Sequence, residues 1–253
     1  MSPAVIHQNL KADIEEHTNQ GLIPTNVNAY TVGDQLYFTV VYAYVGKENT
    51  PKYIFFHDLP VSEAEDTILA LAYGFQPITL APYSSDGQPM LFIVLERTSE
   101  ERVLLLEKTK DEWSIEEAGL ISQGYVPISF RYRPVAGGSS MIYSIFQKKD
   151  DVFFRWGLTY SQLLNHAYYE RRNGNFVSDI TWEQMENGTA TYTAVFTKDR
   201  YGLTQFYVDA RFNRHSFIST HSQLSRIGFH VKAVTPLIIG ANMSPGFLGT
   251  YWR

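Results

Sequence analysis

The sequence predicts an α+β repeat fold: a propeller-like ring of five units, each a three-stranded antiparallel β unit with an outer helix. Two observations predict this class. Glycines recur every 50 to 54 residues, and each ends a helix-like segment and opens an alternating, strand-like one. These glycines are Gly21, Gly74, Gly124, Gly174 and Gly228. A fixed period of this length is the sequence signature of repeat architectures.

We interpret residues 1–253 as a single repeat-built domain, because no linker, low-complexity tract or change of composition divides the chain. The predicted units cover approximately residues 1–50, 51–100, 101–150, 151–202 and 203–253.

The segment before each glycine predicts a short amphipathic helix, because apolar residues recur there at helical spacing. A glycine after the last turn takes the left-handed conformation that ends many helices. Three of these segments also contain a Ser or Thr followed three residues later by Glu or Gln, which predicts a capping box. The pairs are Ser62 with Glu65, Ser114 with Glu117, and Thr159 with Gln162.

The segment after each glycine predicts a β-hairpin. Asp-Gly and Asn-Gly are strong hairpin signals because both residues tolerate positive φ. The predicted turns lie at Gly33-Asp34, Asp86-Gly87, Ala136-Gly137-Gly138, Asn187-Gly188 and Gly240-Ala241-Asn242.

A third strand follows four of the hairpins, at residues 52–58, 102–108, 152–157 and 204–210, so the unit is predicted as strand, strand, strand, helix. No such strand follows the fifth hairpin, and the N-terminal segment 4–9 is the only substitute. Pairing of this segment with the last hairpin would close the ring. An open, curved array is the alternative.

Four pieces of the chain carry a family resemblance: GLTYSQLLNHAYYE, GYVPISF, ATYTAVFTK and DRYGLTQFYVDARF. They resemble the bacterial tandem repeat domain that precedes the β-lactamase-like domain of fungal polyglycine hydrolases. The resemblance covers nearly the whole chain and implies a propeller-like repeat fold with an accessory, substrate-engaging role. The catalytic Ser-x-x-Lys motif of those proteases is absent here, so the resemblance supplies no catalytic residue. In architecture, the ring is also similar to the five-fold pentein propellers.

Alternation along the first strand after each glycine separates two faces. One face is apolar and is expected to pack under the helices; its members are Val27, Leu80, Phe130, Ile180 and Val234. The opposite face is polar or small; its members are Asn26, Asn28, Thr79, Ala81, Ser129, Arg131, Asp179, Thr181, Ala233 and Thr235. It would line a central pocket, or it is the ordinary solvent-facing side of an antiparallel sheet.

Arg131 and Asp179 are the only charged members of the polar face. They would bind a ligand, or they would form an ion pair with each other. Charged residues within the third strands lie among large apolar residues, so each of these charges needs an ionic or hydrogen-bonding partner. The candidate ligand-binding residues are Asn26, Asn28, Ser129, Arg131, Arg155, Asp179, Thr181, Trp182, Asp209 and Thr235.

Aromatic residues make up 15% of the chain, and those that recur in register are expected to pack between neighbouring units. They are Phe38, Phe92, Tyr143 and Tyr192. Tyr132 and Trp182 share one position in two units, where alternation places them on the helix side. Trp156 has no counterpart in the other units, and unrepeated aromatics are what sugar- or peptide-binding grooves use.

A formal net charge of −5 and the lack of a Lys/Arg block argue against nucleic-acid and membrane-surface binding. The chain has no cysteine, which excludes disulfides and thiolate metal sites. Hydrolase-elbow, phosphate-loop and dinucleotide motifs are absent, and the histidines lack metal-ligand spacing, so no cofactor and no metal is expected.

The leading functional prediction is a non-catalytic, soluble binding module that engages a ligand (a small molecule, a carbohydrate or a peptide) or a protein through the polar and aromatic face of the ring. The alternative is an enzyme, a hydrolase or an oxidoreductase, acting on a small organic substrate in a central polar pocket. A self-assembling structural protein is a third hypothesis. The N-terminus has no signal-peptide pattern, and the composition fits either a cytoplasmic protein or the mature form of a secreted one.

Overall fold

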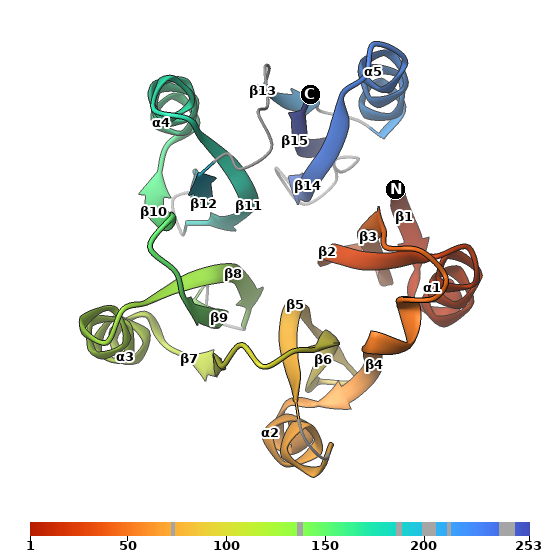
Figure 1. Cartoon of the computed structure of the whole chain (residues 1–253), viewed down its shortest axis with the longest axis vertical. Helices are drawn as coiled ribbons and strands as arrows, with labels where there is room; N and C mark the ends of the chain where they lie inside the picture. Colours follow the sequence, from red (N-terminus) through yellow and green to blue (C-terminus); the bar gives the residue numbers. More distant parts are fainter. Residues whose placement is uncertain (72–73, 136–138, 186–188, 199–205, 212–213, 238–245) are drawn as a thin grey trace.

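Five three-stranded antiparallel sheets stand around a common centre, each with one helix on its outer side (Figure 1). This is a computed structural model, and it describes residues 1–253 except 72–73, 136–138, 186–188, 199–205, 212–213 and 238–245. The predicted turns at 136–138, 187–188 and 240–242 therefore lie outside the described residues. The predicted count of five helices and five β units is confirmed.

Each sheet takes its strands from one contiguous stretch of chain. The first two sheets contain β1 (Ser2–Ile6), β2 (Leu22–Val32), β3 (Gln35–Tyr44), β4 (Tyr53–Pro60), β5 (Phe75–Ser85) and β6 (Gln88–Arg97). The next two contain β7 (Arg102–Lys108), β8 (Tyr125–Pro134), β9 (Ser140–Lys148), β10 (Val152–Leu158), β11 (Asn175–Gln184) and β12 (Ala190–Lys198). The last contains β13 (Phe206–Arg211), β14 (His230–Leu237) and β15 (Gly246–Trp252).

The outer strand of each sheet comes before the helix and hairpin with which it folds, which corrects the predicted order. β4 pairs with β6, which comes after the helix in the chain, and does not pair with the hairpin that precedes β4. β4 and β5 are both antiparallel to β6, so they run parallel to each other on either side of it. Two strands that run parallel in one sheet need a crossover connection. The helix is that crossover. The unit is therefore strand, helix, strand, strand.

The N-terminal strand does not complete the last sheet. β1 pairs with β3 in the first sheet, and β13 takes the position that segment 4–9 was expected to fill. Within the described residues, the first and last units meet through apolar packing instead of a strand ladder. Tyr30 and Val41 of the first unit share one buried cluster with Phe217, Val234 and Phe247 of the last.

The helices occupy the outside of the ring, as expected (Figure 1). They are α1 (Leu10–Asn19), α2 (Val61–Ala70), α3 (Lys110–Ser122), α4 (Tyr160–Arg172) and α5 (Arg214–Arg226). Two short 3-10 helices cover His7–Asn9 and Thr50–Lys52. Each long helix turns one face onto its sheet, where it meets the apolar face of the inner strand. Val27, Leu80, Phe130, Ile180 and Val234 are all buried there, as predicted.

Aromatic residues of the middle strands pack between neighbouring units, as expected. Phe38 of β3 lies 6.4 Å from Phe92 of β6, measured between ring centroids. Tyr143 of β9 belongs to the buried cluster of the second unit. Adjacent units therefore contact each other through side chains, and among the described residues no strand ladder continues from one sheet into the next.

Helix capping follows the prediction at only one of three places. Thr159 and Gln162 form the predicted box at the start of α4. The start of α3 uses Thr109 and Glu112 instead, so Ser114 lies inside the helix and donates to the carbonyl of Lys110. α2 begins at Val61 after Pro60, and no side chain caps it. Both wrong predictions place the helix start too late in the chain.

We expect Thr109→Ala to lower the free energy of unfolding by about 1 kcal/mol, because the amide of Glu112 loses its acceptor. Ser114→Ala, at the position that the sequence suggested, should change it much less. Urea denaturation followed by circular dichroism measures both. Equal losses in the two variants would contradict the assignment of the cap to Thr109.

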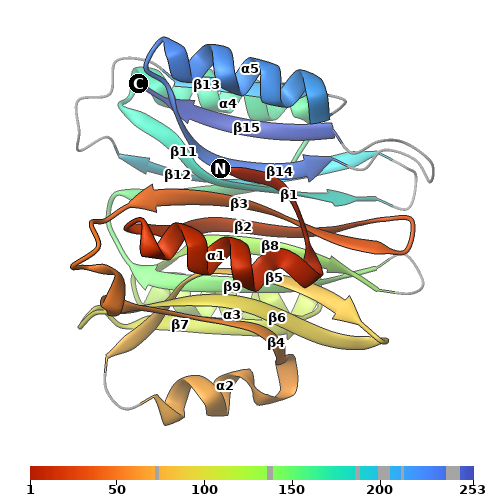
Figure 2. The ribbon, with the colours of Figure 1, turned by 90° about the vertical axis from the view of Figure 1, so that its right-hand side faces the viewer.

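The five inner strands, β2, β5, β8, β11 and β14, share one irregularity. Each skips one residue in its ladder at the same place, namely Thr25, Ile78, Ile128, Ser178 or Lys232. A bulge of this kind bends a strand and increases its twist. The inner strands surround the centre (Figure 1), and they end on one side of the ring, where the described hairpin turns at residues 33–34 and 86–87 also lie (Figure 2). We call this the hairpin end.

Candidate functional site

The polar face of the inner strands is buried at the centre of the ring. Its members are at most 5% exposed, so they do not form a solvent-facing sheet surface. They are Asn26, Asn28, Thr79, Ala81, Ser129, Arg131, Asp179, Thr181, Ala233 and Thr235. We call this set the axial cluster. Burial of this many polar groups requires partners within the protein.

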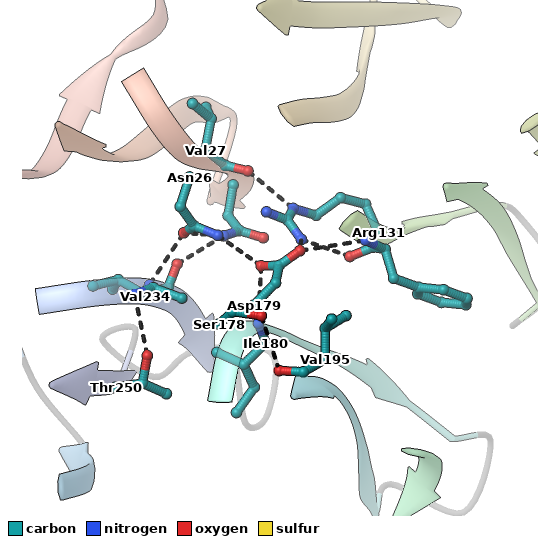
Figure 3. Close-up of polar contacts among 12 residues, drawn as sticks. Asn26, Val27, Arg131, Ser178, Asp179, Ile180, Val195, Val234 and Thr250 are labelled. Carbon is teal, nitrogen blue, oxygen red and sulfur yellow. Dashed lines mark hydrogen bonds and ion pairs between the residues drawn. The ribbon is translucent and has the colours of Figure 1, made fainter. Parts of the chain in front are cut away.

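An ion pair between two units lies at the heart of the axial cluster (Figure 3). Arg131 of β8 donates from Nη1 to Asp179 of β11 over 2.6 Å, and its Nε donates to the carbonyl of Val27 in β2 over 3.0 Å. The Asp179 carboxylate also accepts from Asn26 at 2.7 Å and from the Ile180 amide at 2.9 Å. Arg131 and Asp179 therefore pair with each other, and together they connect three of the five units.

The two asparagines of the first unit connect it to the last. Asn28 donates to the carbonyl of Val234 over 2.7 Å, and Asn26 accepts from the amide of Val234 at 3.1 Å (Figure 3). An amide side chain can donate and accept at once, which suits the buried N–H and C=O groups of this residue on β14. These contacts reinforce the apolar packing between the first and last units.

A cavity of about 530 Å³ opens at the hairpin end. Every unit contributes to its wall, mostly from the last residues of the inner strands. The lining residues used below are Tyr30, Tyr83, Tyr132, Arg133, Trp182 and Glu183, and Pro236 represents the last unit. The volume lies within the range of small-molecule sites, which are mostly apolar with a few placed polar groups. We call it the hairpin-end pocket.

The two charged residues of the hairpin-end pocket are each compensated by a neighbour. Arg133 is buried and pairs with Glu107, while its Nε donates to the Tyr143 hydroxyl over 3.0 Å. The buried carboxylate of Glu183 lies 2.8 Å from Nζ of Lys110. The pocket therefore offers polar atoms and aromatic faces with little net charge.

Tyr132 and Trp182 occupy equivalent places in the third and fourth units. Each packs on a helix-side cluster, as expected, and each also lines the hairpin-end pocket. The Tyr132 hydroxyl lies 3.0 Å from Oγ1 of Thr193, and burial raises the pKa of Tyr132. The phenol is therefore neutral at physiological pH, and it can serve as a hydrogen-bonding group but not as an anion.

A second polar cluster joins the pocket to the junction of the first two units. The hydroxyl of Tyr83 donates to Asp58 over 2.8 Å, and the same carboxylate lies 2.6 Å from His7 and 2.9 Å from His57. Burial alone would raise the pKa of Asp58, but hydrogen bonds from His57, Tyr83 and His7 outweigh it and lower the pKa below its usual value. Burial, supported by the Asp58 carboxylate, raises the pKa of Tyr83.

The lowered pKa of Asp58 predicts a pH dependence of stability. A carboxyl group with a depressed native pKa contributes stability above its unfolded pKa, near 4, and loses it as the pH falls through the native value. We expect the free energy of unfolding to fall below about pH 4, and to fall less steeply in Asp58→Asn. Asparagine tolerates the positive φ of 56° at this position. Denaturant titrations between about pH 2 and pH 6 measure the slope.

Asp86→Asn is the matched control for this pH experiment, because Asp86 also has a positive φ, of 50°, but lies exposed in a turn. Its pH profile should follow that of the parent protein. Identical slopes for the parent, Asp58→Asn and Asp86→Asn would contradict the role assigned to the Asp58 hydrogen bonds.

The predicted site residues fall in four places. Seven lie in the axial cluster: Asn26, Asn28, Ser129, Arg131, Asp179, Thr181 and Thr235. Trp182 lies in the hairpin-end pocket. Arg155 lies in an exposed hollow beside α4 with His166 and Tyr169, and Trp156 packs on Trp113 at 5.7 Å, away from the centre. The side chain of Asp209 lies outside the described residues.

Sequence reasoning missed Tyr83, Arg133 and Glu183 as pocket residues. They share one register position, nine residues after the glycine of their unit. A signal was present, because that position carries tyrosine, arginine or glutamate in the first four units while the position six residues after the glycine stays apolar.

Among the described residues, no group of three or more His, Asp or Glu side chains is placed to hold a metal ion. Within the same residues, every helix is too short or too polar to cross a lipid bilayer.

Comparison of the chain with protein families finds no matching family model, and comparison with curated proteins finds no match either. The resemblance to the tandem repeats of polyglycine hydrolases thus stays a prediction from the sequence.

Proposed function

We propose that this protein is a binding module whose hairpin-end pocket holds a small, uncharged organic ligand. The single observation that carries the proposal is a cavity of about 530 Å³ walled by all five units. Repeat scaffolds recognise ligands through equivalent positions that differ from copy to copy. The position nine residues after each unit's glycine varies in part, since it is tyrosine in the first two units and Arg133, Glu183 and Leu237 in the other three.

The chemistry of the pocket supports an uncharged ligand with a flat apolar face. Trp182 and Tyr132 supply aromatic surface, which stacks at low entropic cost. A charged ligand would have to compete with Glu107 for Arg133, or with Lys110 for Glu183. An uncharged group can instead accept a hydrogen bond from a serine of the rim, or donate one to Glu183, without breaking either ion pair.

We also propose that the five units are copies of one module. The same strand, helix, strand, strand order and the same bulge position in all five inner strands support this origin. The ring is then a closed one, held between its first and last units by side chains of the axial cluster and of the shared apolar cluster around Val234.

A ligand screen tests the binding proposal. Saturation-transfer NMR is run with neutral mono- and disaccharides, uncharged aromatic heterocycles and end-blocked tripeptides. We expect hits whose affinity falls at least tenfold in Trp182→Phe or Glu183→Gln. Trp156→Phe, a tryptophan outside the pocket, should leave affinity unchanged. Hits that bind all variants equally, or no hit among the three classes, would refute the proposal.

A further inference from the structure

Three buried polar atoms of the axial cluster have no hydrogen-bond partner among the described residues. They are Nη2 of Arg131, Oγ1 of Thr79 and Oγ of Ser129. All three residues are at least nine-tenths buried. A buried donor left without an acceptor costs about 1–3 kcal/mol, and more when it is charged, so such groups normally have a partner.

The three atoms share one region of the ring. Thr79 and Ser129 occupy the same register position, five residues after the glycine, on β5 and β8. In the first and fourth units this position is held by Asn26 and Asp179, whose side chains meet at 2.7 Å. Side chains at this position therefore point to the centre. Thr79 and Ser129 belong to the adjacent second and third units, which complete that side of the ring.

The side chain of Arg131 reaches from the third unit to the first. It starts on β8 and reaches the carbonyl of Val27 on β2, and β5 lies between these two strands in the ring (Figure 1). The inward-facing positions of β5 hold two short side chains, Thr79 and Ala81, and both are buried. Nε and Nη1 are occupied by protein acceptors, and Nη2 is the guanidinium nitrogen left for another partner.

We propose that one small hydrogen-bond acceptor, a water molecule or a halide ion, is bound beside the centre of the ring between β5 and β8. Nη2 of Arg131 donates to it, and the hydroxyls of Thr79 and Ser129 complete its coordination. Buried water typically makes about three hydrogen bonds to groups that would otherwise be unsatisfied. Asp179 already neutralises Arg131 at 2.6 Å, and this charge balance favours water over the halide.

This axial solvent site is separate from the hairpin-end pocket, which does not include Arg131, Thr79 or Ser129 in its wall. Its occupant holds the second unit to the third through Thr79, which has no other described hydrogen-bond partner. The occupant thereby extends the network of the axial cluster from four units to all five.

High-resolution crystal structures test the proposal, with crystals grown in sodium bromide and in a halide-free sodium nitrate buffer. We expect density within hydrogen-bonding distance of all three atoms. An anomalous bromine signal there identifies a halide, and the same density in both crystals without that signal identifies water. Direct bonds from Nη2 to protein atoms, or density that touches only one of the three atoms, would overturn it.

Two threonine variants test whether the hydroxyl of Thr79 binds the occupant of the site. Thr79→Val preserves the shape of the side chain but removes its hydroxyl, so the occupancy of the site should fall. Thr250→Val is the control, because the hydroxyl of Thr250 is buried but accepts from the Ala233 amide at 3.1 Å and is not part of the site. Full occupancy retained in Thr79→Val would also overturn the proposal. Should Thr79→Val not fold, the two crystals of the parent protein still decide.

Discussion

Asp179→Ala should lower the free energy of unfolding by about 3–5 kcal/mol, the largest effect we expect from a polar substitution. The change leaves Arg131 buried with an uncompensated charge, and loss of one partner of a buried ion pair typically costs this much. Asn26 loses its acceptor at the same time. Guanidinium denaturation followed by fluorescence and circular dichroism measures the loss.

The exposed pair of Lys108 and Glu116 is the control for Asp179→Ala. Its atoms are 2.6 Å apart, as close as those of the buried pair, but both side chains reach solvent. Exposed pairs are worth about 0–1 kcal/mol, so Glu116→Ala should cost little. The double variant Arg131→Met with Asp179→Leu should recover much of the loss, because apolar groups can replace a buried pair. Similar losses for Asp179→Ala and Glu116→Ala would contradict the prediction.

Trp113→Ala should cost about 3–5 kcal/mol, because it opens a cavity in the core of the third unit. Trp113 belongs to α3, and its side chain is fully buried on the side of the helix that faces the sheet. Its ring lies 5.0 Å from Phe130 and 5.8 Å from Phe154 of the next unit. Its indole N–H donates to Ser144 over 2.8 Å. The substitution thus weakens one unit and its junction with the neighbour.

Thermal and chemical unfolding measure the effect of Trp113→Ala, and two variants divide it into parts. Ser144→Ala removes only the acceptor and should cost about 1–3 kcal/mol through the unsatisfied N–H. Trp156→Ala truncates a tryptophan that is 42% exposed and should cost less than Trp113→Ala. A larger loss in Trp156→Ala than in Trp113→Ala would refute this account of the core.

The recurring glycines predicted the number of helices and hairpins because chain reversal and helix termination are local events. Gly124, for example, has a φ of 83° directly after α3, a conformation that most other residues avoid. Strand partnership was not predictable in the same way. The apolar run at the start of β4 fits the hairpin before it as well as the hairpin after it, so the sequence does not select its partner.

The candidate sites were predictable in part, because side-chain direction along a strand is also a local property of the sequence. Alternation placed Arg131 and Asp179 on one face correctly, because side-chain direction in a strand follows from its period of two. The sequence did not reveal that this face is sealed from solvent, since that depends on how closely five strands approach. Nor did it indicate that the pocket begins one residue beyond Arg131 and Thr181, at Tyr132 and Trp182.

The contiguous origin of each sheet has a consequence for the connectivity of the chain. The backbone between Arg97 and Arg102 belongs to no ladder, and its residues are mostly exposed. A protease nick at residues 98–101 would separate two whole units from three without removing a single strand from its partners. The two parts would remain docked through contacts such as those of Arg131 with Val27 and of Asp179 with Asn26, so we expect the nicked molecule to keep its five sheets intact.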